Sequence, residues 1–205
     1  MNKYSLTFLL LIIFFLTGSW DLSGQSWEFI KEKEGVKLYT KKEVNISVKS
    51  FKGEVYLHAP VEKVYSLITN VKNFDNWDED ITEIRVLLNE KDKHIQYYLV
   101  YDVAWPVADR DLVVDAIITT DTLTGIITVE GKPLPNVIPE NPDLVRIKKY
   151  WQKWTIIPKE RGIIHLILEG SVDPGGNVPA WLSNMVITDT PLKSIRSIQT
   201  HIGAK

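Results

Sequence analysis

Cysteine is absent from all 205 residues of the chain. The chain therefore forms no disulfide, offers no thiolate nucleophile, and has no cysteine to carry the lipid of a bacterial lipoprotein. Stability has to come from a buried core, and a hydrophobic content of 44% is enough to build one. Repeats, low-complexity runs and linker-like stretches are also missing, which predicts a single folded domain.

An excess of positive charge is lacking as well. The chain has 24 Lys and Arg residues against 26 Asp and Glu residues, a formal net charge of -2. No stripe of basic residues alternates with aromatic residues, so the electrostatic footprint of a nucleic-acid-binding protein is missing. We expect no nucleic-acid partner.

Motifs of common catalytic and metal sites are also absent. The four histidines are scattered and form no His-x-x-x-His or Glu-x-x-His pair. There is no Gly-x-Ser-x-Gly elbow and no phosphate-binding glycine loop. The sequence therefore predicts no metal site, no cofactor and no catalytic residues.

One long hydrophobic run occurs, near the N-terminus. Lys3 precedes a mostly apolar segment from Leu6 to Leu16, and small and polar residues follow up to Gly24. This is the order of a secretory signal peptide, and the apolar core is short for a membrane span. We predict that residues 1–24 are cleaved near Gly24, which leaves a domain of residues 25–205 in the periplasm or secreted. An uncleaved membrane anchor is the alternative.

Two hydrophobic periodicities divide the remaining chain. Spacings of three and four residues over residues 60–71 predict an amphipathic helix. Residues 27–42 are expected to begin as a short polar helix or an extended lead, and residues 72–80 as a polar turn or short helix. Alternation of apolar and polar residues predicts strands at about residues 36–40, 47–57, 84–89, 94–104, 111–120, 125–130, 144–157 and 162–172.

Glycine and proline mark two irregular features. Gly53 lies inside a predicted strand and indicates a bulge or sharp bend that curls the sheet. Four prolines crowd the loop between residues 133 and 142. A loop of that length inside a compact domain tends to be a flap or a rim.

The C-terminal stretch is predicted to close the domain. Residues 173–176, Asp-Pro-Gly-Gly, permit a chain reversal, and Asn177 is expected to cap a helix. Apolar residues then recur at helical spacing over residues 181–201, which places Lys193 on the solvent side. Pro191 predicts a kink in this helix. The order of elements indicates an α+β helix-grip fold, with a curved antiparallel β-sheet wrapped around a long C-terminal α-helix.

Two motifs in this order carry a family resemblance. They are Trp105-Pro106-Val107-Ala108-Asp109-Arg110-Asp111 and Asp173-Pro174-Gly175-Gly176-Asn177-Val178-Pro179-Ala180-Trp181. With them, residues 27–202 resemble a START domain, the lipid-transfer family, and an exported stand-alone copy resembles its bacterial branch. The resemblance implies a tunnel between the sheet and the C-terminal helix that binds one lipid-like molecule without catalysis.

Strand alternation predicts which side chains face this helix. Apolar faces usually pack densely, so the residues alone favour a filled core. The resemblance instead implies the walls of a pocket of ~300 to 1,000 Å³. Strands around residues 97–101 and 150–154 carry aromatic residues on both faces, which indicates a second packed layer or an exposed ligand rim. The residues expected to bind the ligand are Tyr98, Val100, Trp105, Arg110, Leu112, Val114, Ile118, Trp154, Leu166, Leu168, Trp181, Met185 and Leu192.

Three of these side chains have two interpretations. Arg110 either meets a polar ligand head, because a buried guanidinium requires partners, or forms a loop-fixing ion pair with Asp109 or another carboxylate. Trp105 and Trp181 either line the entrance or cap the core.

The expected function is reversible binding of a hydrophobic or amphipathic small molecule, such as a lipid, a sterol-like molecule or an isoprenoid, as a carrier or sensor. We expect a monomer and allow for transient membrane contact. The alternative is a helix-grip enzyme of the cyclase or dehydratase type acting on a small aromatic or polyketide-like substrate, with Tyr98, Tyr101, Asp102 and Arg110 as candidate groups. A third class is an interaction module without a ligand, which would use the proline-rich loop as a contact.

Overall fold

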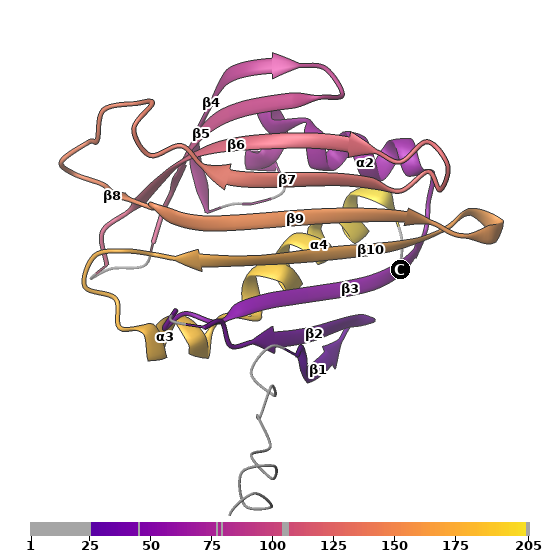
Figure 1. Cartoon of the computed structure of the whole chain (residues 1–205), viewed down its shortest axis with the longest axis horizontal. Helices are drawn as coiled ribbons and strands as arrows, with labels where there is room; N and C mark the ends of the chain where they lie inside the picture. Colours follow the sequence, from indigo (N-terminus) through magenta and orange to yellow (C-terminus); the bar gives the residue numbers. More distant parts are fainter. Residues whose placement is uncertain (1–25, 45, 77, 79, 104–106, 204–205) are drawn as a thin grey trace, which may run out of the picture.

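A ten-stranded curved sheet with helices on one face makes up the protein in this computed structural model, which describes residues 26–44, 46–76, 78, 80–103 and 107–203 (Figure 1). The strand order is β1-β2-β3-β10-β9-β7-β6-β5-β4, with antiparallel neighbours, and β8 pairs in parallel with β6. The strands are β1 (Glu28–Lys33), β2 (Val36–Lys41), β3 (Ser50–His58), β4 (Ile81–Glu90), β5 (His94–Tyr101), β6 (Arg110–Thr120), β7 (Ile127–Pro133), β8 (Val145–Arg146), β9 (Lys149–Pro158) and β10 (Ile163–Asp173). The α-helices are α2 (Val61–Thr69), α3 (Ala180–Met185) and α4 (Asp189–Ile202), and the short 3₁₀ helices are η2 (Val71–Asn76) and η3 (Glu160–Gly162).

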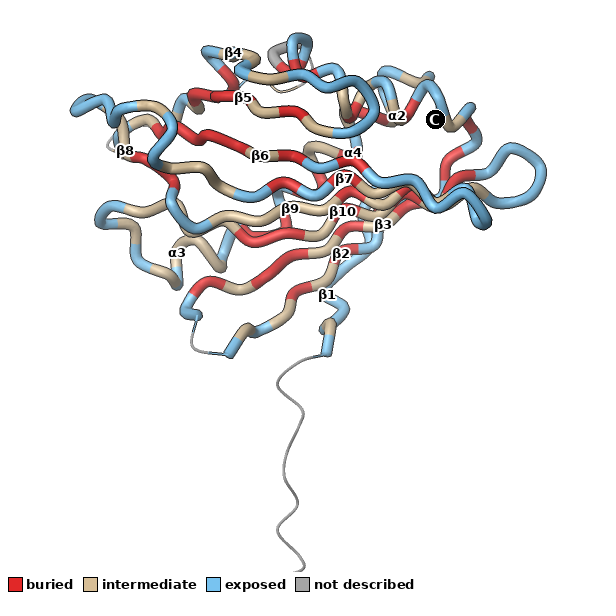
Figure 2. Tube along the Cα trace, turned by 45° about the horizontal axis from the view of Figure 1, so that its top comes forward, coloured by how far each residue is buried: buried red, intermediate tan, exposed pale blue. Residues whose placement is uncertain are grey.

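The N-terminal lead is an extended strand and not the short polar helix that was the other prediction. β1 and β2 form a hairpin, and Glu34 and Gly35 at its turn have φ values of 54° and 77°. Two positive φ angles are the signature of a tight hairpin turn. β1 is an exposed edge strand, whereas buried and exposed residues alternate along β2 and β3 (Figure 2). The alternation shows that burial on one sheet face begins at β2.

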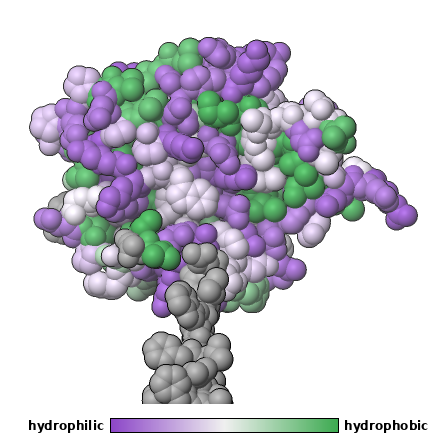
Figure 3. Space-filling view, viewed as in Figure 1, coloured by the Kyte–Doolittle hydropathy of each residue, from purple (hydrophilic) through white to green (hydrophobic). Residues whose placement is uncertain are grey.

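The proline-rich loop covers part of the sheet face opposite the helices. Leu134, Ile138 and Leu144 pack there against Tyr98, Val100 and Val113, which are buried. The second packed layer is therefore the correct alternative for this aromatic strand, and the loop is an anchored cover instead of a flap. Elsewhere on this side of the molecule, hydrophobic side chains lie in separate small groups among polar ones (Figure 3).

Gly53 does not form a bulge, one of the two predicted alternatives. Its strand β3 pairs with β10 in continuous register, with Gly53 opposite Leu168. A Cβ atom at this position would lie 2.8 Å from Cδ1 of Ile195 and 2.9 Å from Cβ of Pro191. Glycine is needed because α4 rests directly on the strand backbone.

The closing helix is divided, and the break does not occur at Pro191 as predicted. α3 and α4 are separated by residues 186–188, while Pro191 is the third residue of α4. The first N–H groups of a helix have no helical acceptor, so proline is tolerated at this position. The prediction of a cap by Asn177 is also wrong, because α3 begins after Pro179 without a side-chain cap.

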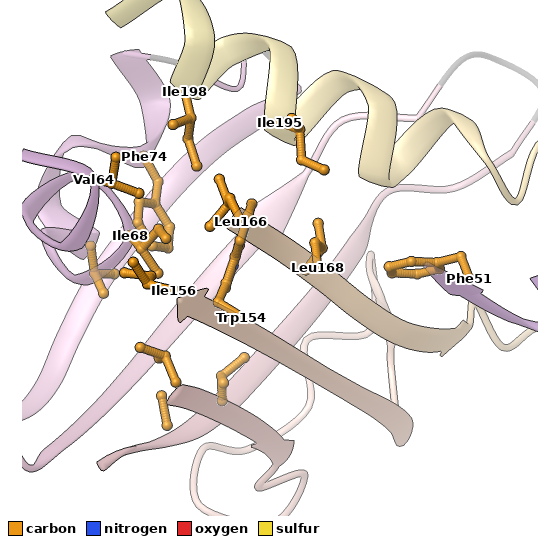
Figure 4. Packing of buried hydrophobic residues seen from close by; sticks show 14 of the residues in the cluster. Phe51, Val64, Ile68, Phe74, Trp154, Ile156, Leu166, Leu168, Ile195 and Ile198 are labelled. Carbon is orange, nitrogen blue, oxygen red and sulfur yellow. The ribbon is translucent and has the colours of Figure 1, made fainter. Parts of the chain in front are cut away.

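The core lies between α4, α2 and the concave face of the sheet. Ile195 and Ile198 of α4 point toward Leu166 and Leu168 of β10 (Figure 4). Both leucines are fully buried, as strand alternation predicted for their face. Trp154 lies beside them on β9 and extends the apolar floor toward β7.

Candidate ligand-binding cavity

A cavity of about 700 Å³ lies between the concave face of the sheet and the two C-terminal helices. Its floor is largely apolar and comes from β5, β6, β7 and β9; it includes Ile95, Leu99, Leu112, Ala116, Val129 and Trp154. Leu182, Val186 and Ile187, from α3 and the break that follows it, line the opposite side. The break in the closing helix therefore lies at the cavity.

Arg110 brings the two sequence motifs together at one end of this cavity. Its side chain is 4% exposed. Nε donates a hydrogen bond to the carbonyl oxygen of Pro174 at 3.3 Å, and Nη1 donates to the carbonyl oxygen of Ala108. Burial lowers the pKa of Arg110, and the nearby charge of Asp109 opposes this effect.

The loop-fixing ion pair, one of the two interpretations of Arg110, is not formed among the described residues. Asp109 Oδ1 instead accepts a hydrogen bond from the backbone N–H of Val103 at 3.1 Å. Within the described part of the chain, the hydrogen bonds of Arg110 go to backbone carbonyls and not to a carboxylate. The guanidinium lines the cavity, which agrees with the alternative that places it inside.

The Asp-Pro-Gly-Gly turn holds the carbonyl of Pro174 against Arg110. Gly175 and Gly176 have φ values of 65° and 62°, a conformation that other residues rarely adopt. The backbone N–H of Gly175 donates to Asp173 Oδ1 at 3.1 Å. The glycines are thus required by the backbone of a turn that reaches the cavity.

Three tyrosines add hydroxyl groups to the cavity wall. Burial is the main cause that raises the pKa of Tyr97, Tyr101 and Tyr150 well above the ordinary tyrosine value. Their hydroxyls therefore stay protonated at neutral pH. Tyr150 donates its hydroxyl hydrogen to Oε1 of Gln152, another residue of the wall.

A cation closes one side of the cavity. Lys193 Nζ on α4 lies 2.6 Å from Asp80 Oδ2 and 3.0 Å from Asp78 Oδ1. Burial lowers the pKa of Lys193, but the hydrogen bonds to Asp80 and Asp78 outweigh burial and raise it overall. Lys193, which was predicted to lie on the solvent side, is partly exposed, and its side chain ties α4 to the segment before β4.

α3 is fastened to the segment that precedes β3. Oδ1 of Asn184 accepts a hydrogen bond from the backbone N–H of Lys49 at 2.8 Å, and Nδ2 donates to the carbonyl of Ser47 at 3.0 Å. Its neighbour Ser183 lines the cavity, and the buried Oγ atom of Ser183 has no hydrogen-bond partner within the described residues.

The structure brings some of the expected ligand-binding residues together and separates others. Arg110, Leu112 and Trp154 line the cavity. The following are buried in the adjoining core: Val114, Ile118, Leu166, Leu168 and Leu192.

Four further residues of the expected set lie elsewhere. Tyr98 and Val100 are on the opposite face of the sheet, under the proline-rich loop. Trp181 and Met185 are 69% and 67% exposed, because α3 is a separate short helix that presents them to solvent. Trp105 lies outside the described residues.

The predicted ligand-binding set omits Tyr97, Leu99 and Tyr101 on β5, which line the cavity, and Tyr101 was named only for the enzyme alternative. The register of the β5–β6 pair places Tyr101 opposite Arg110 and Leu99 opposite Leu112. Residues directly opposite in an antiparallel pair share a face. The face of β6 was predicted correctly, so the register of this hairpin was the signal that could have selected the odd-numbered residues of β5.

The groups proposed for an enzyme are not all at one site. Tyr101, Asp102 and Arg110 line the cavity, but Tyr98 faces the other side of the sheet. None of the four histidines lines the cavity. Within the described residues, no group of three or more His, Cys, Asp or Glu side chains is arranged to hold a metal ion.

A curved sheet that grips C-terminal helices, with a cavity between the layers, defines the helix-grip class of α+β proteins. Residues 19–201 match the sequence model of the START domain family. The chain therefore belongs to this family. No helix in the described ranges combines the length and apolar character that crossing a membrane requires.

Similar proteins agree with this assignment. A STAR-related lipid transfer protein from Xanthomonas axonopodis superposes with a TM-score of 0.79 at 27% identity, over 86% of this chain and 98% of that one. The uncharacterized protein PA1579 of Pseudomonas aeruginosa is 28% identical over 177 residues, 86% of this chain and 87% of that protein. Human STARD10 has a TM-score of 0.77 at 16% identity, over 93% and 77% of the two chains, which shows the shared fold.

Proposed function

We propose that this protein reversibly binds one hydrophobic or amphipathic small molecule in the cavity between the sheet and α3–α4, as a carrier or sensor and without catalysis. The observation that carries the proposal is an apolar cavity of about 700 Å³ in a chain that belongs to the START domain family. This volume lies in the range of roughly 300 to 1,000 Å³ that is usual for small-molecule sites. Lipids, sterol-like molecules and isoprenoids are the ligand classes that suit its walls.

Affinity in such a cavity comes mainly from apolar area. Removing apolar ligand surface from water contributes roughly 25 cal/mol per Å². Leu99, Leu112 and Trp154 provide broad apolar contact, while Arg110 and the tyrosines supply the few polar groups that orient a ligand. The site therefore favours a molecule with a large hydrophobic part and a small polar part.

Ligand exchange requires the cavity to open. The two segments that flank α3, residues 174–179 and 186–188, lie outside the regular helices and can change backbone angles. The Lys193 contacts to Asp78 and Asp80 hold α4 closed on the other side. We place the moving part at α3 and the break that follows it, instead of at Pro191.

The cellular setting is part of the proposal. The hydrophobic segment near Lys3 and the small residues up to Gly24 support export to the periplasm or secretion after cleavage. We expect a monomer that contacts membranes transiently to collect or deliver its ligand.

Native mass spectrometry of the purified protein, followed by organic extraction and lipid analysis, tests this function. A lipid or isoprenoid bound at close to one molecule per chain is the expected result and identifies the ligand class. A protein that purifies empty and also fails to bind fluorescent lipids and sterols would contradict the proposal.

A further inference from the structure

We infer that the ligand is an amphiphile with an oxyanion head group, a carboxylate or a phosphate, which is bound by the Arg110 guanidinium. This inference rests on the proposed function and names the chemistry of the ligand at the same site. Three observations carry it: the incomplete pairing of Arg110, the position of Tyr101 directly opposite it, and the change of the cavity floor from polar to apolar along β6.

Arg110 is a buried cation without a buried anion. Its Nε and Nη1 atoms donate to the carbonyls of Pro174 and Ala108, whereas Nη2 has no acceptor among the described residues. A buried charge is costly unless it is both paired and hydrogen-bonded. A planar guanidinium with a free N–H edge is suited to carboxylate or phosphate oxygens.

Tyr101 is the polar residue directly opposite Arg110 in the β5–β6 pair. Its neutral hydroxyl can donate to a ligand oxygen. Tyr97 is level with Val114, and Gln152 is level with Ala116 through Gly131, so both lie further along the floor. The Arg110 end of the cavity therefore offers N–H and O–H hydrogens to a ligand with acceptor oxygens.

The carboxylates of the cavity wall do not replace such a ligand. Asp78 and Asp80 are both engaged by Lys193. Asp102 and Asp189, which also line the cavity, are exposed. Asp109 lies near Arg110, but its side chain accepts from the backbone of Val103. Among the described residues, no carboxylate hydrogen-bonds to Arg110 inside the cavity.

The cavity changes character along β6. Arg110 is at one end, Leu112 follows on the same face, and Ala116 lies about 20 Å away at 3.3 Å per residue. Ile95, Val129 and Trp154 surround the far part with apolar surface. An extended amphiphile placed with its head at Arg110 has its tail along this apolar floor.

The test compares ligands that differ in the head group alone. The full purified chain, freed of bound lipid, is titrated with palmitic acid, palmitoyl lysophosphatidic acid and hexadecanol by isothermal calorimetry, and each titration is repeated with Arg110→Gln and with the control Arg85→Gln. Arg85 lies over the Tyr98 ring on the opposite face of the sheet, paired with Glu83. The two acidic probes separate a carboxylate head from a phosphate head.

We expect at least one acidic probe to bind the unmodified protein about ten- to hundredfold more tightly than hexadecanol, because a charge-assisted hydrogen bond is worth roughly 1.5 to 3 kcal/mol. Arg110→Gln should remove this preference and leave hexadecanol affinity unchanged, and Arg85→Gln should change neither. If Arg110→Gln does not fold, Tyr101→Phe keeps the volume and should weaken the acidic probe about threefold to tenfold while sparing hexadecanol.

The outcomes separate the inference from the function. The head-group inference is overturned if hexadecanol and both acids bind with equal affinity. It is also overturned if the preference for an acid survives Arg110→Gln, or survives Tyr101→Phe where that variant is used instead. Both outcomes leave lipid binding intact. Failure of all three probes to bind overturns the inference, and failure also with fluorescent lipids and sterols overturns the proposed function.

Discussion

Arg110 and Arg146 are both buried arginines, 4% and 5% exposed, and they lie on the adjacent strands β6 and β8. Arg146 is saturated: Nε and Nη2 donate to the two carboxylate oxygens of Asp111 at 2.8 Å and 2.7 Å. Its Nη1 donates to the carbonyls of Pro135 and Ile138 at 2.6 Å and 3.0 Å. Among the described residues, Arg110 has only backbone carbonyls as partners, and it faces the cavity.

The difference between the two arginines follows from strand geometry. Arg110 and Asp111 are consecutive on β6, so their side chains point to opposite faces of the sheet. Asp111 is thereby committed to the outer loop, where it pairs with Arg146, and cannot neutralise Arg110. One Arg-Asp dipeptide thus provides the anchor of a covering loop and a cation available to a ligand. Complete pairing gives Arg146 a structural role, and incomplete pairing is the feature on which the proposed binding role of Arg110 rests.

The largest expected effect is the loss of the saturated pair. Asp111→Ala leaves the Arg146 guanidinium buried without an anion, which should lower the free energy of unfolding by about 3 to 5 kcal/mol. Urea denaturation followed by circular dichroism measures this change. The matched control is Glu140→Ala, which breaks the exposed Lys148–Glu140 pair and should cost at most about 1 kcal/mol. A loss below 1 kcal/mol for Asp111→Ala would show that the buried pair does not anchor the loop.

Removing both charges of the pair should be much milder than removing one. In the double variant Asp111→Leu with Arg146→Met, no uncompensated charge remains, and apolar replacements of similar volume are often neutral. We expect about 2 kcal/mol or more of the single-variant loss to be recovered, measured as the coupling energy of a double-mutant cycle. Additive effects of the two replacements would argue against a direct pair.

A tyrosine on the cavity face of the sheet and a tyrosine on its outer face should affect stability differently at alkaline pH. Burial raises the pKa of Tyr97 in the folded protein above its unfolded value of about 10. Its contribution to stability is present below pH 10 and is lost as pH rises above it, because the unfolded chain then releases a proton that the folded chain keeps. From pH 9 to pH 11 the unfolding free energy should fall by about 1.4 kcal/mol more in the unmodified protein than in Tyr97→Phe.

An unchanged pH dependence in Tyr97→Phe would mean that this hydroxyl titrates normally in the folded state. Tyr56→Phe is the control, since its side chain is 62% exposed on the outer face.

The smallest effect on stability is expected at the side of the cavity that Lys193 closes. Lys193→Ala removes partly exposed ion pairs to Asp78 and Asp80 and should cost up to about 1 kcal/mol. Because these pairs hold α4 closed, ligand dissociation measured by stopped-flow fluorescence should accelerate by about fivefold or less, the factor that corresponds to this energy. Arg196→Ala removes the exposed contact of α4 to Glu34 and provides the control. Equal acceleration by both variants would remove the special role of Lys193.

Much of the fold followed from sequence periodicity. The inward faces of β6 and β10 and the amphipathic α2 were predicted because polar residues occupy alternate or opposite positions there. Which alternate residues of β5 face the cavity could not be predicted in the same way, because Tyr97 and Tyr98 are both buried. Tyr97 is in the cavity wall, and Tyr98 is under the proline-rich loop. Burial on both faces removes the signal that alternation depends on.

Long-range pairing limited the prediction of the site. Arg146 and Asp111 are separated by 35 positions in the chain, and no local pattern connects them. The position of Pro191 within the helix also misled the assignment of Trp181 and Met185, because a single continuous helix would have buried both. From the sequence alone, a proline that breaks a helix cannot be distinguished from a proline in the first turn of a new helix.

The two hydrogen bonds of Asn184 contribute to how often the closing layer can part from the sheet. Any motion that lifts α3 breaks the contacts to Lys49 and Ser47, each of which contributes roughly 0.5 to 1.5 kcal/mol. Their sum of about 1 to 3 kcal/mol alone would correspond to an open population of roughly 1 to 15%. Under the proposed function, such a protein spends most of its time closed around a ligand and still opens often enough to exchange it, and Asn184 shifts the balance between retention and release.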